Sequence, residues 1–192
     1  MTLELYHSGH STCSQKVRIC LAEKGLDWVG HEMRFSSGDH LTPDYLLLNP
    51  NGVVPTLIHD GGVIRESTII NEYLDDAYPS APLRPEDARA KARMRLWVQH
   101  EEEELFVAVR PVSLNLIMKQ VIGRYSEDEL DALLKHHPRQ DRVAFLKKVF
   151  KAPFDADAVG KSRRRLAAAF EHMEETLSRN LWLAGDSYSL AD

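Results

Sequence analysis

The sequence predicts an α/β domain followed by an all-helical domain. Short apolar runs bounded by glycine, proline and asparagine alternate with helical periodicity over the first part of the chain. No convincing strand follows residue 65, and apolar residues then recur every three or four positions, which is typical of amphipathic helices. Three prolines in residues 78–85 indicate a linker. We therefore expect an α/β domain at residues 1–78, a linker at 79–87 and a helical domain at 88–192.

The first forty residues predict a strand, a helix and a second strand. An apolar run at residues 3–6 ends at Ser8-Gly9, and helical spacing then continues to Gly25. Residues 28–33 form the next β-type run. This βαβ order predicts parallel strands joined by a right-handed crossover.

A turn, a hairpin and a third helix follow. A short helix at residues 42–48 ends at the turn sequence NPNG, residues 49–52. Pro55 interrupts the next apolar run, so we expect a strand that starts there, a cis peptide bond before it, and an exposed backbone at Val54. The sequence DGG at residues 60–62 indicates a hairpin, and the apolar stripe that follows predicts a helix ending before Pro79.

The second domain shows only helical patterns. Apolar stripes predict helices within residues 86–118, 130–134, 143–150 and 166–177. Pro111 is expected to bend the first of them. The last four residues, SLAD, match the S-x-x-D pattern that opens a helix. We therefore expect the helical domain to be truncated at its C-terminal end.

Composition and charge limit the function classes. A net charge of −5 and a pI near 6.0 argue against an obligate nucleic-acid or anionic-membrane binder, because both need a basic surface. No apolar run approaches the roughly 20 residues of a membrane span. Cys13 and Cys20 lie two turns apart on one helix and cannot form a disulfide there. These features predict a soluble protein of a reducing, cytoplasmic compartment, with no nucleic-acid and no membrane partner.

The stretch from His10 to Arg18, HSTCSQKVR, is the strongest candidate site. It places Ser11 and Cys13 where the first backbone N–H groups of a helix lack intrahelical partners. The helix dipole adds about half a positive charge at that end, so a thiolate or carboxylate is favoured there. A side chain at this position can activate a bound thiol or supply one.

Simpler structural roles account for the same residue types. Ser11 can be an ordinary helix cap, and Glu66-Ser67 can be an acidic residue and a cap before the third helix. Cys13 is either a reactive first-turn thiol or a small side chain packed under that turn. These alternatives stay open at the level of single motifs.

Two histidine-containing stretches invite a metal interpretation. They are His136-His137 and the run from His100 to Glu104. Neither has the H-E-x-x-H spacing of a helical metal site. We expect solvated helix faces at both places and no metal.

The joint order of four motifs resembles that of the cytosolic glutathione S-transferase superfamily, serine/cysteine type. The motifs are HSTCSQKVR, NPNGVVPTL, ESTIINEYL and the terminal SLAD. The first is similar to zeta-class maleylacetoacetate isomerases and bacterial reductive dehalogenases, and the third looks like bacterial β-etherases. The resemblance implies a thioredoxin-like first domain that binds glutathione, an all-α substrate domain, and a cytoplasmic homodimer with a role in detoxification.

The resemblance also implies roles for particular residues. The implied glutathione-binding residues are Ser11, His40, Val54, Pro55, Glu66 and Ser67. The backbone of Val54 would pair with the cysteinyl amide, and Glu66-Ser67 would hold the γ-glutamyl end. His40 lies where family members often contact the glycyl carboxylate. Apart from the resemblance, the position of Arg110 beside Pro111 leads us to expect that it faces the electrophile.

Three functions remain as alternatives. The first is a glutathione S-transferase in which Ser11 supports the glutathione thiolate as it attacks an apolar, small-molecule electrophile. The second is a glutathione-dependent oxidoreductase that works through Cys13, of the reductive dehalogenase, etherase or thiol-disulfide type. The third is a non-catalytic binding protein that kept this fold. Glutathione is the co-substrate in the first two, and no metal is expected in any of them.

Overall fold

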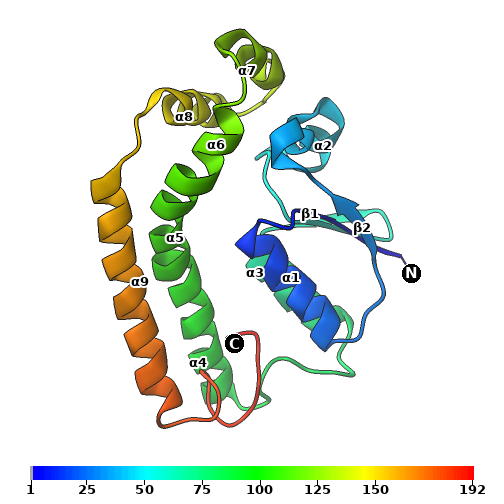
Figure 1. Ribbon diagram of the computed structural model, residues 1–192. Coiled ribbons are helices and arrows are strands. Elements are labelled where there is room, and N and C mark those ends of the chain that lie inside the picture. Colours follow the sequence, from blue (N-terminus) through cyan, green and yellow to red (C-terminus); the bar gives the residue numbers. More distant parts are fainter. Residues whose placement is uncertain (1) are drawn as a thin grey trace. The chain divides into compact units, whose positions relative to one another are not determined.

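The structure is a computed structural model that describes residues 2–192, apart from the side chains at positions 121 and 122 (Figure 1). The chain divides into two compact units. The first comprises Met1–Ala77 and Lys119–Ala152, and the second comprises Tyr78–Met118 and Pro153–Asp192. Residues 119–152 thus pack with the N-terminal unit, although the sequence analysis places them in the helical domain. The predicted domain boundaries stay a prediction.

The first unit is built on a four-stranded mixed sheet in the order β2-β1-β3-β4. Its N-terminal elements are β1 (Leu3–His7), α1 (Thr12–Glu23), β2 (Val29–Glu32), η1 (Phe35–Ser37), η2 (Asp39–Leu41), α2 (Pro43–Leu48), β3 (Thr56–His59), β4 (Gly62–Arg65) and α3 (Ser67–Ala77). From the later part of the chain it adds α6 (Lys119–Ile122), α7 (Glu127–Leu134) and α8 (Gln140–Lys151). The predicted parallel pairing of the first two strands is confirmed, and so is the hairpin of β3 and β4.

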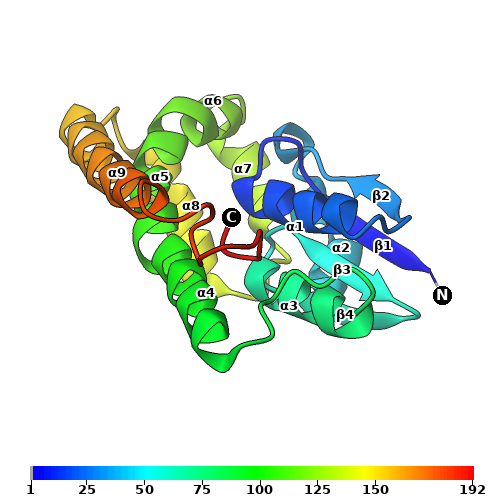
Figure 2. The ribbon, with the colours of Figure 1, turned by 90° about the horizontal axis from the view of Figure 1, so that it is seen from below.

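Helices cover both faces of this sheet. Figures 1 and 2 show α1 and α3 side by side on one face, and α2 lies on the other in Figure 1. Alternation along β1 explains the layering, because Leu3 and Leu5 are buried while Tyr6 packs against a second cluster built around Tyr45 of α2. The α/β class predicted for the first part of the chain is confirmed.

A buried ion pair joins α1 to α3. Lys24, at the C-terminal end of α1, donates from Nζ to Oδ1 of Asp75 at 2.8 Å, and their side chains are 0% and 3% exposed. Around it, Val17 and Leu21 of α1 pack in the same core as Leu74 of α3. The pair fixes the two helices that begin at the candidate site, since a buried charge cannot lose its partner cheaply.

The second unit consists of helices and connecting loops. They are α4 (Ala88–His100), the π-helical segment η3 (Glu101–Leu105), α5 (Phe106–Ser113), the π-helical segment η4 (Leu114–Met118) and α9 (Ala156–Leu177). The predicted first helix is therefore interrupted twice by π-helical segments, and Pro111 lies inside α5. Small buried residues let α5 and α9 pack closely, and Ser162 of α9 donates to the carbonyl of Ala108. Among its described residues, the only β pairing is an isolated bridge between Trp182 and Gly185.

The last residues adopt the contacts of a helix cap. Both the backbone N–H and the hydroxyl of Ser189 donate to Oδ2 of Asp192, at 3.0 and 3.2 Å. Asp192 also accepts from the backbone of Leu183 at 2.8 Å. The terminal S-x-x-D segment therefore has side-chain contacts like those of a helix N-cap, although residues 189–192 themselves form no helix.

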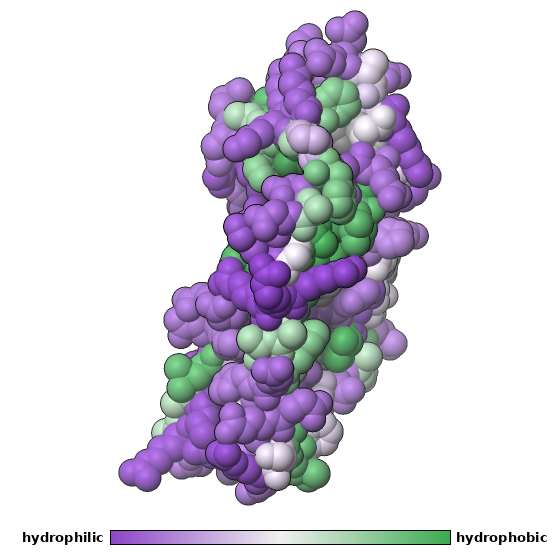
Figure 3. Space-filling view, turned by 60° about the vertical axis from the view of Figure 1, so that its left-hand side comes forward, coloured by the Kyte–Doolittle hydropathy of each residue, from purple (hydrophilic) through white to green (hydrophobic). Residues whose placement is uncertain are grey.

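Several large apolar side chains are exposed at the surface. Figure 3 shows hydrophobic side chains gathered between stretches of hydrophilic ones on one face of the molecule. The exposed large apolar side chains of the second unit include Leu96, Phe106, Val107, Phe170, Leu177 and Leu181. None of the described helices is both long enough and apolar enough to cross a membrane.

Candidate functional site

Strand register brings three of the predicted site segments to one end of the strands of the sheet. Tyr6 of β1 pairs with Thr56 of β3, and Thr56 pairs in turn with Arg65 of β4. The loop after β1 leads to Ser11, the chain before β3 contains Val54, and the chain after β4 is Glu66. Residues more than forty positions apart in sequence therefore meet where these strands end or begin.

Ser11 is the N-cap of α1. Its backbone is extended, with φ −90° and ψ 118°, and its Oγ accepts from the backbone N–H of Ser14 at 3.2 Å. The hydroxyl proton is not used in that bond, so it can still be donated to an anion in front of the helix. The capping role considered as the simpler alternative is present, and it leaves the donor role intact.

Short-range contacts fix the loop that carries Ser11. Oγ of the buried Ser14 accepts from the N–H of Ser8 at 3.3 Å, and the N–H of Ser11 donates to the carbonyl of Ser8 at 3.2 Å. Arg18, one turn further along α1, donates to the same carbonyl at 3.2 Å and lies 3.1 Å from Nδ1 of His7. Partial burial, together with the Arg18 guanidinium, lowers the pKa of His7, which favours its neutral form.

A buried polar network shapes the chain before β3. Thr56 is fully buried, and its Oγ1 lies 2.9 Å from the phenol of Tyr45 and 3.1 Å from Nδ2 of Asn49. Tyr45 and Asn49 both donate to the carbonyl of Val53, at 2.6 and 2.9 Å. Burial raises the pKa of Tyr45 to about 12, so the phenol keeps its proton.

Val54 is held by that network. The predicted cis peptide bond is present, and it joins Val54 to Pro55. The β1–β3 ladder ends at the pair of Tyr6 with Thr56, so the sheet does not use the backbone of Val54. Val54 as a whole residue is only 7% exposed, so the pairing of its backbone with a ligand stays a prediction.

Glu66 and Ser67 form a strained entrance to α3. Glu66 is exposed and has φ +66°, a left-handed conformation that is costly for a residue with a side chain. Ser67 begins α3 and is 8% exposed. The first N–H groups of that helix have no intrahelical partners, which makes this end suitable for a carboxylate.

One residue at this helix start was not identified from the sequence. Lys16 of α1 donates from Nζ to Oγ1 of Thr68 at 3.0 Å, which places an ammonium group beside the first turn of α3. The signal was present in HSTCSQKVR as the lysine five positions after Ser11. Only the packing of α1 against α3 reveals where it points.

His40 is buried in the segment between β2 and α2. It is 8% exposed, its ring meets Phe35 edge-on at 4.9 Å, and its Nδ1 is buried without a hydrogen-bond partner. Burial lowers the pKa of His40 to about 4, so the ring is neutral at pH 7. A buried lone pair costs less than a buried unpaired N–H, which favours the tautomer with the proton on Nε2.

The two cysteines differ in environment. Cys13 lies at the second helical position of α1 and is half-buried, whereas Cys20 is on the core side of the same helix. Burial raises the pKa of Cys20 to about 12, and this thiol therefore stays protonated.

Arg110 belongs to α5 of the second unit, with its guanidinium 5.9 Å from the ring centroid of Phe106. The predicted contact of Arg110 with an electrophile stays a prediction.

The described side chains that could bind a metal ion are dispersed. Within residues 2–192, no group of three or more histidine, cysteine, aspartate or glutamate side chains is placed to hold an ion. The solvated helix face expected at His136-His137 is wrong for His137, which is 2% exposed and follows the end of α7.

Comparison with known proteins decides the family. Models of the N-terminal and C-terminal domains of glutathione S-transferases match residues 10–77 and 115–192. Protein LigF of Sphingobium sp. (strain NBRC 103272 / SYK-6) is 31% identical over 195 residues, which cover 100% of this chain and 76% of LigF. The chain belongs to the glutathione S-transferase family. Members of this family are catalytic glutathione transferases.

Further relatives of this glutathione S-transferase agree with the resemblance found in the motifs. The crystal structure of the β-etherase LigF superposes with a TM-score of 0.89 at 30% identity and covers 100% of this chain and 79% of that one. Glutathione S-transferase 3 of Zea mays is 31% identical over 192 residues, which are 99% of this chain and 73% of that protein. Maleylacetoacetate isomerase of Pseudomonas aeruginosa is 41% identical over 96 residues, which are 48% of this chain and 45% of the isomerase.

Proposed function

We propose that this glutathione S-transferase activates the thiol of glutathione with the hydroxyl of Ser11 and directs the thiolate at an apolar electrophile. The observation that carries the proposal is the geometry of Ser11, whose Oγ accepts from Ser14 while its proton stays available at the N-terminus of α1. A thiolate in front of this helix would receive a hydroxyl hydrogen bond and the favourable field of the helix dipole.

The required stabilisation is within reach of these groups. An ordinary thiol has a pKa of about 8.5, and lowering it by about two units takes roughly 2.7 kcal/mol of preferential stabilisation of the thiolate. A hydrogen bond to a charged acceptor contributes about 1.5–3 kcal/mol, and a helix N-terminus adds about 0.3–1 kcal/mol. Ser11 then acts as a hydrogen-bond donor and forms no covalent bond.

The other parts of glutathione would be held at the same end of the strands. We assign the cysteinyl amide to the backbone of Val54, whose carbonyl and N–H lie outside the sheet ladder. The γ-glutamyl carboxylate is assigned to the first turn of α3 at Ser67, with the Glu66 carboxylate for the γ-glutamyl ammonium and Lys16 nearby. The glycyl carboxylate is assigned to the Nε2–H of His40.

Aryl ethers are a second candidate for the electrophile, favoured by the similarity to the β-etherase LigF along the whole chain. In this reaction the glutathione sulfur bonds to the ether carbon as the carbon–oxygen bond breaks. The aryloxide leaves with the bonding electron pair and takes a proton from solvent. Ser11 would have the same role, and a reductive second step would require the Cys13 thiol and a further thiol as reductant.

The proposal also covers the cellular compartment, the oligomeric state and the biological role. We infer a cytoplasmic homodimer with a role in detoxification, because the fold is that of glutathione S-transferases and the two cysteines of the sequence, Cys13 and Cys20, are not joined in a disulfide. A size measurement in solution tests the dimer directly. A mass near 21.9 kDa, that of one chain, would contradict it.

The function is tested by calorimetric glutathione binding and by conjugation rates with a panel of halogenated and aryl-ether electrophiles. We expect the wild type to bind glutathione, Ser11→Ala to bind it with similar affinity, and kcat/KM of that variant to fall by about 10- to 100-fold. Cys13→Ser should retain the rate if Ser11 is the activating group. Loss of turnover in Cys13→Ser, with a trapped conjugate, would favour the oxidoreductase, and no glutathione binding by the wild type would favour a non-catalytic protein.

A further inference from the structure

We propose that residues 125–139, here called the α7 cap, hold the segment of residues 34–52 in the conformation that binds glutathione. The cap would thereby determine the affinity of the protein for glutathione without contacting glutathione. The inference rests on the proposed function, because this segment contains His40. The contacting residues of the cap and the segment are 85 to 95 positions apart in sequence, and they meet at both ends of the segment. The cap belongs to the same compact unit.

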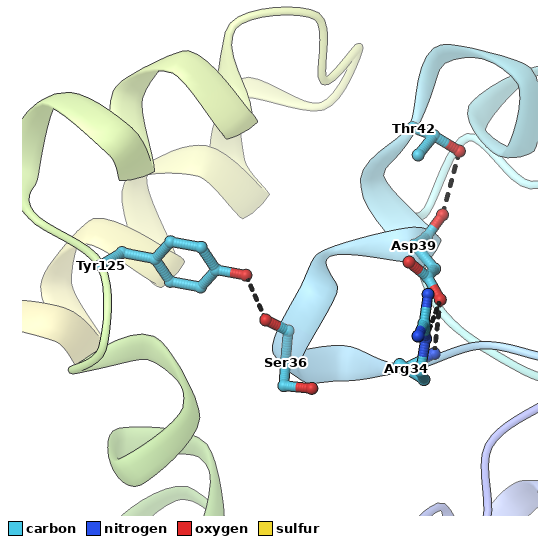
Figure 4. Close-up of polar contacts among 5 residues, drawn as sticks. All are labelled: Arg34, Ser36, Asp39, Thr42 and Tyr125. Atoms are coloured by element: carbon cyan, nitrogen blue, oxygen red, sulfur yellow. Dashed lines mark hydrogen bonds and ion pairs between the residues drawn. The ribbon is translucent and has the colours of Figure 1, made fainter.

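The first contact is a hydrogen bond at η1. The phenol of Tyr125 donates to the carbonyl of Ser36 at 2.6 Å (Figure 4). Partial burial, with the carboxylates of Asp39 and Glu129 nearby, raises the pKa of Tyr125, so the phenol keeps the proton that it donates. Figure 4 also shows the contact between Asp39 of η2 and Arg34, the residue before η1. The carboxylate of Asp39 accepts from the backbone N–H of Arg34 at 3.0 Å and so links the two short helices.

The second contact fills a space that a glycine leaves open. Gly38 links η1 to η2 with φ +68°, and a Cβ built there would lie 2.5 Å from Cδ1 of Leu133. Leu133 of α7 therefore packs directly on the backbone of the segment, two residues before His40. Gly38 meets both needs of this position, the left-handed conformation and the close approach.

The third contact lies at the other end of the segment, on the NPNG turn. Arg139 donates to Oδ1 of Asn51 at 2.8 Å. His137 is 2% exposed, and its Nε2 would lie 2.9 Å from a Cβ built at Gly52. Nδ1 of His137 accepts from the backbone N–H of Arg139 at 3.0 Å, which fixes the orientation of the His137 ring.

The cap is itself well defined. Ser126 and Glu129 form a reciprocal capping box at the start of α7, with bonds of 2.8 and 3.2 Å. Lys147 of α8 pairs with Asp131 of α7 at 2.7 Å. Because the capping box and the ion pair to α8 stabilise α7, the α7 cap can hold the segment of residues 34–52 at Ser36 and at Asn51. His40 lies between these two residues in the sequence.

A positioning role predicts a particular kinetic pattern. The loop of Ser11 is fixed by contacts within α1 and its own strand, so weakening the cap should leave kcat at saturating glutathione within about twofold. The affinity for glutathione should fall, because binding must then also order residues 34–52. Tyr125 and Arg139 are therefore positioning residues in this proposal.

The experiment uses the full chain carrying Tyr125→Phe with Arg139→Gln, and Arg179→Gln as the matched control. Arg139 pairs with the exposed carboxylate of Asp141 at 2.6 Å, and Arg179 makes a comparable exposed pair with Glu175 at 2.7 Å but lies in the second unit. We expect the glutathione Kd and KM of the double variant to rise about tenfold, with faster amide hydrogen exchange in residues 34–52. The control should match the wild type in both measurements.

Two results would overturn the inference. One is an unchanged glutathione Kd in the double variant while the wild type binds, and the other is unchanged exchange in residues 34–52. A wild type that binds no glutathione would instead refute the proposed function, and the exchange measurement would still decide whether the cap holds the segment. Leu133→Ala gives a second, apolar test with the same expected pattern.

Discussion

Two loops at the same end of the strands are held in different ways. The loop of Ser11 is fixed by bonds among Ser8, Ser11 and Ser14 and by Arg18, all within eleven residues. The segment of residues 34–52 is fixed by a buried network around Thr56 and by the α7 cap, whose bonds span 88 and 89 residues. The difference teaches that the geometry around Ser11 is encoded locally, whereas the geometry of residues 34–52 depends on distant parts of the chain.

The first prediction concerns acid stability, where the buried segment should show the largest effect. Folded His40 has a pKa of about 4, against an ordinary value of 6.5, so below pH 6.5 the unfolded chain takes up a proton that the folded chain refuses. The contribution of His40 to the free energy of unfolding is therefore fully present above pH 6.5. It is lost as the pH decreases towards 4, by up to about 3 kcal/mol.

Urea unfolding of the wild type and His40→Asn at pH 7 and pH 4.5 measures that dependence. We expect the difference between the two pH values to be smaller in His40→Asn. His136→Gln, at an exposed position, serves as the control and should behave like the wild type. Equal pH dependence in all three proteins would contradict the buried, neutral state of His40.

The second prediction separates the Thr56 network from surface hydrogen bonds. Thr56→Val removes the hydroxyl that Tyr45 and Asn49 contact and leaves each of these buried side chains with only its bond to the Val53 carbonyl, so the free energy of unfolding should fall by about 1–3 kcal/mol. Thr42→Val, which removes an exposed hydroxyl bonded to the Asp39 carbonyl at 3.0 Å, should cost less than about 0.5 kcal/mol. Equal losses in the two variants would mean that the network does not stabilise the segment.

The third and smallest prediction tests how independent the two loops are. Ser14→Ala removes one buried bond, from the Ser8 N–H, and should cost about 1 kcal/mol of stability. Amide exchange in residues 34–52 should remain at the wild-type rate, because no contact of Ser14 reaches that segment. Faster exchange there would show that the two loops are coupled.

Local patterns in the sequence predicted most of the first unit. The turn sequence NPNG, the proline at position 55 and the hydroxyl cluster before α1 each specify backbone geometry within a few residues, and the α/β order, parallel pairing and helix starts followed from them. The glutathione S-transferase family was also predicted from motif order, and the comparisons confirm it. The roles assigned to Ser11, Val54 and Glu66 stay predictions.

Packing between distant segments could not be predicted from one sequence. Nothing in residues 119–152 except helical periodicity indicates that they pack with the first unit, because the donors Tyr125 and Arg139 bond to a backbone carbonyl and a turn side chain, which carry no pattern. Lys16 was missed for the same reason, since its contact with Thr68 depends on how α1 packs against α3. The two π-helical segments after α4 also lack a sequence signal.

The measurement that tests the central claim most directly is the ultraviolet absorbance of the glutathione thiolate as a function of pH, in complexes with wild type, Ser11→Ala and Cys13→Ser. The account predicts a bound-thiol pKa about two units below 8.5 in the wild type, the same value in Cys13→Ser, and a rise of at least about one unit in Ser11→Ala. A bound-thiol pKa that is equal in the wild type and in Ser11→Ala would contradict activation of glutathione by Ser11.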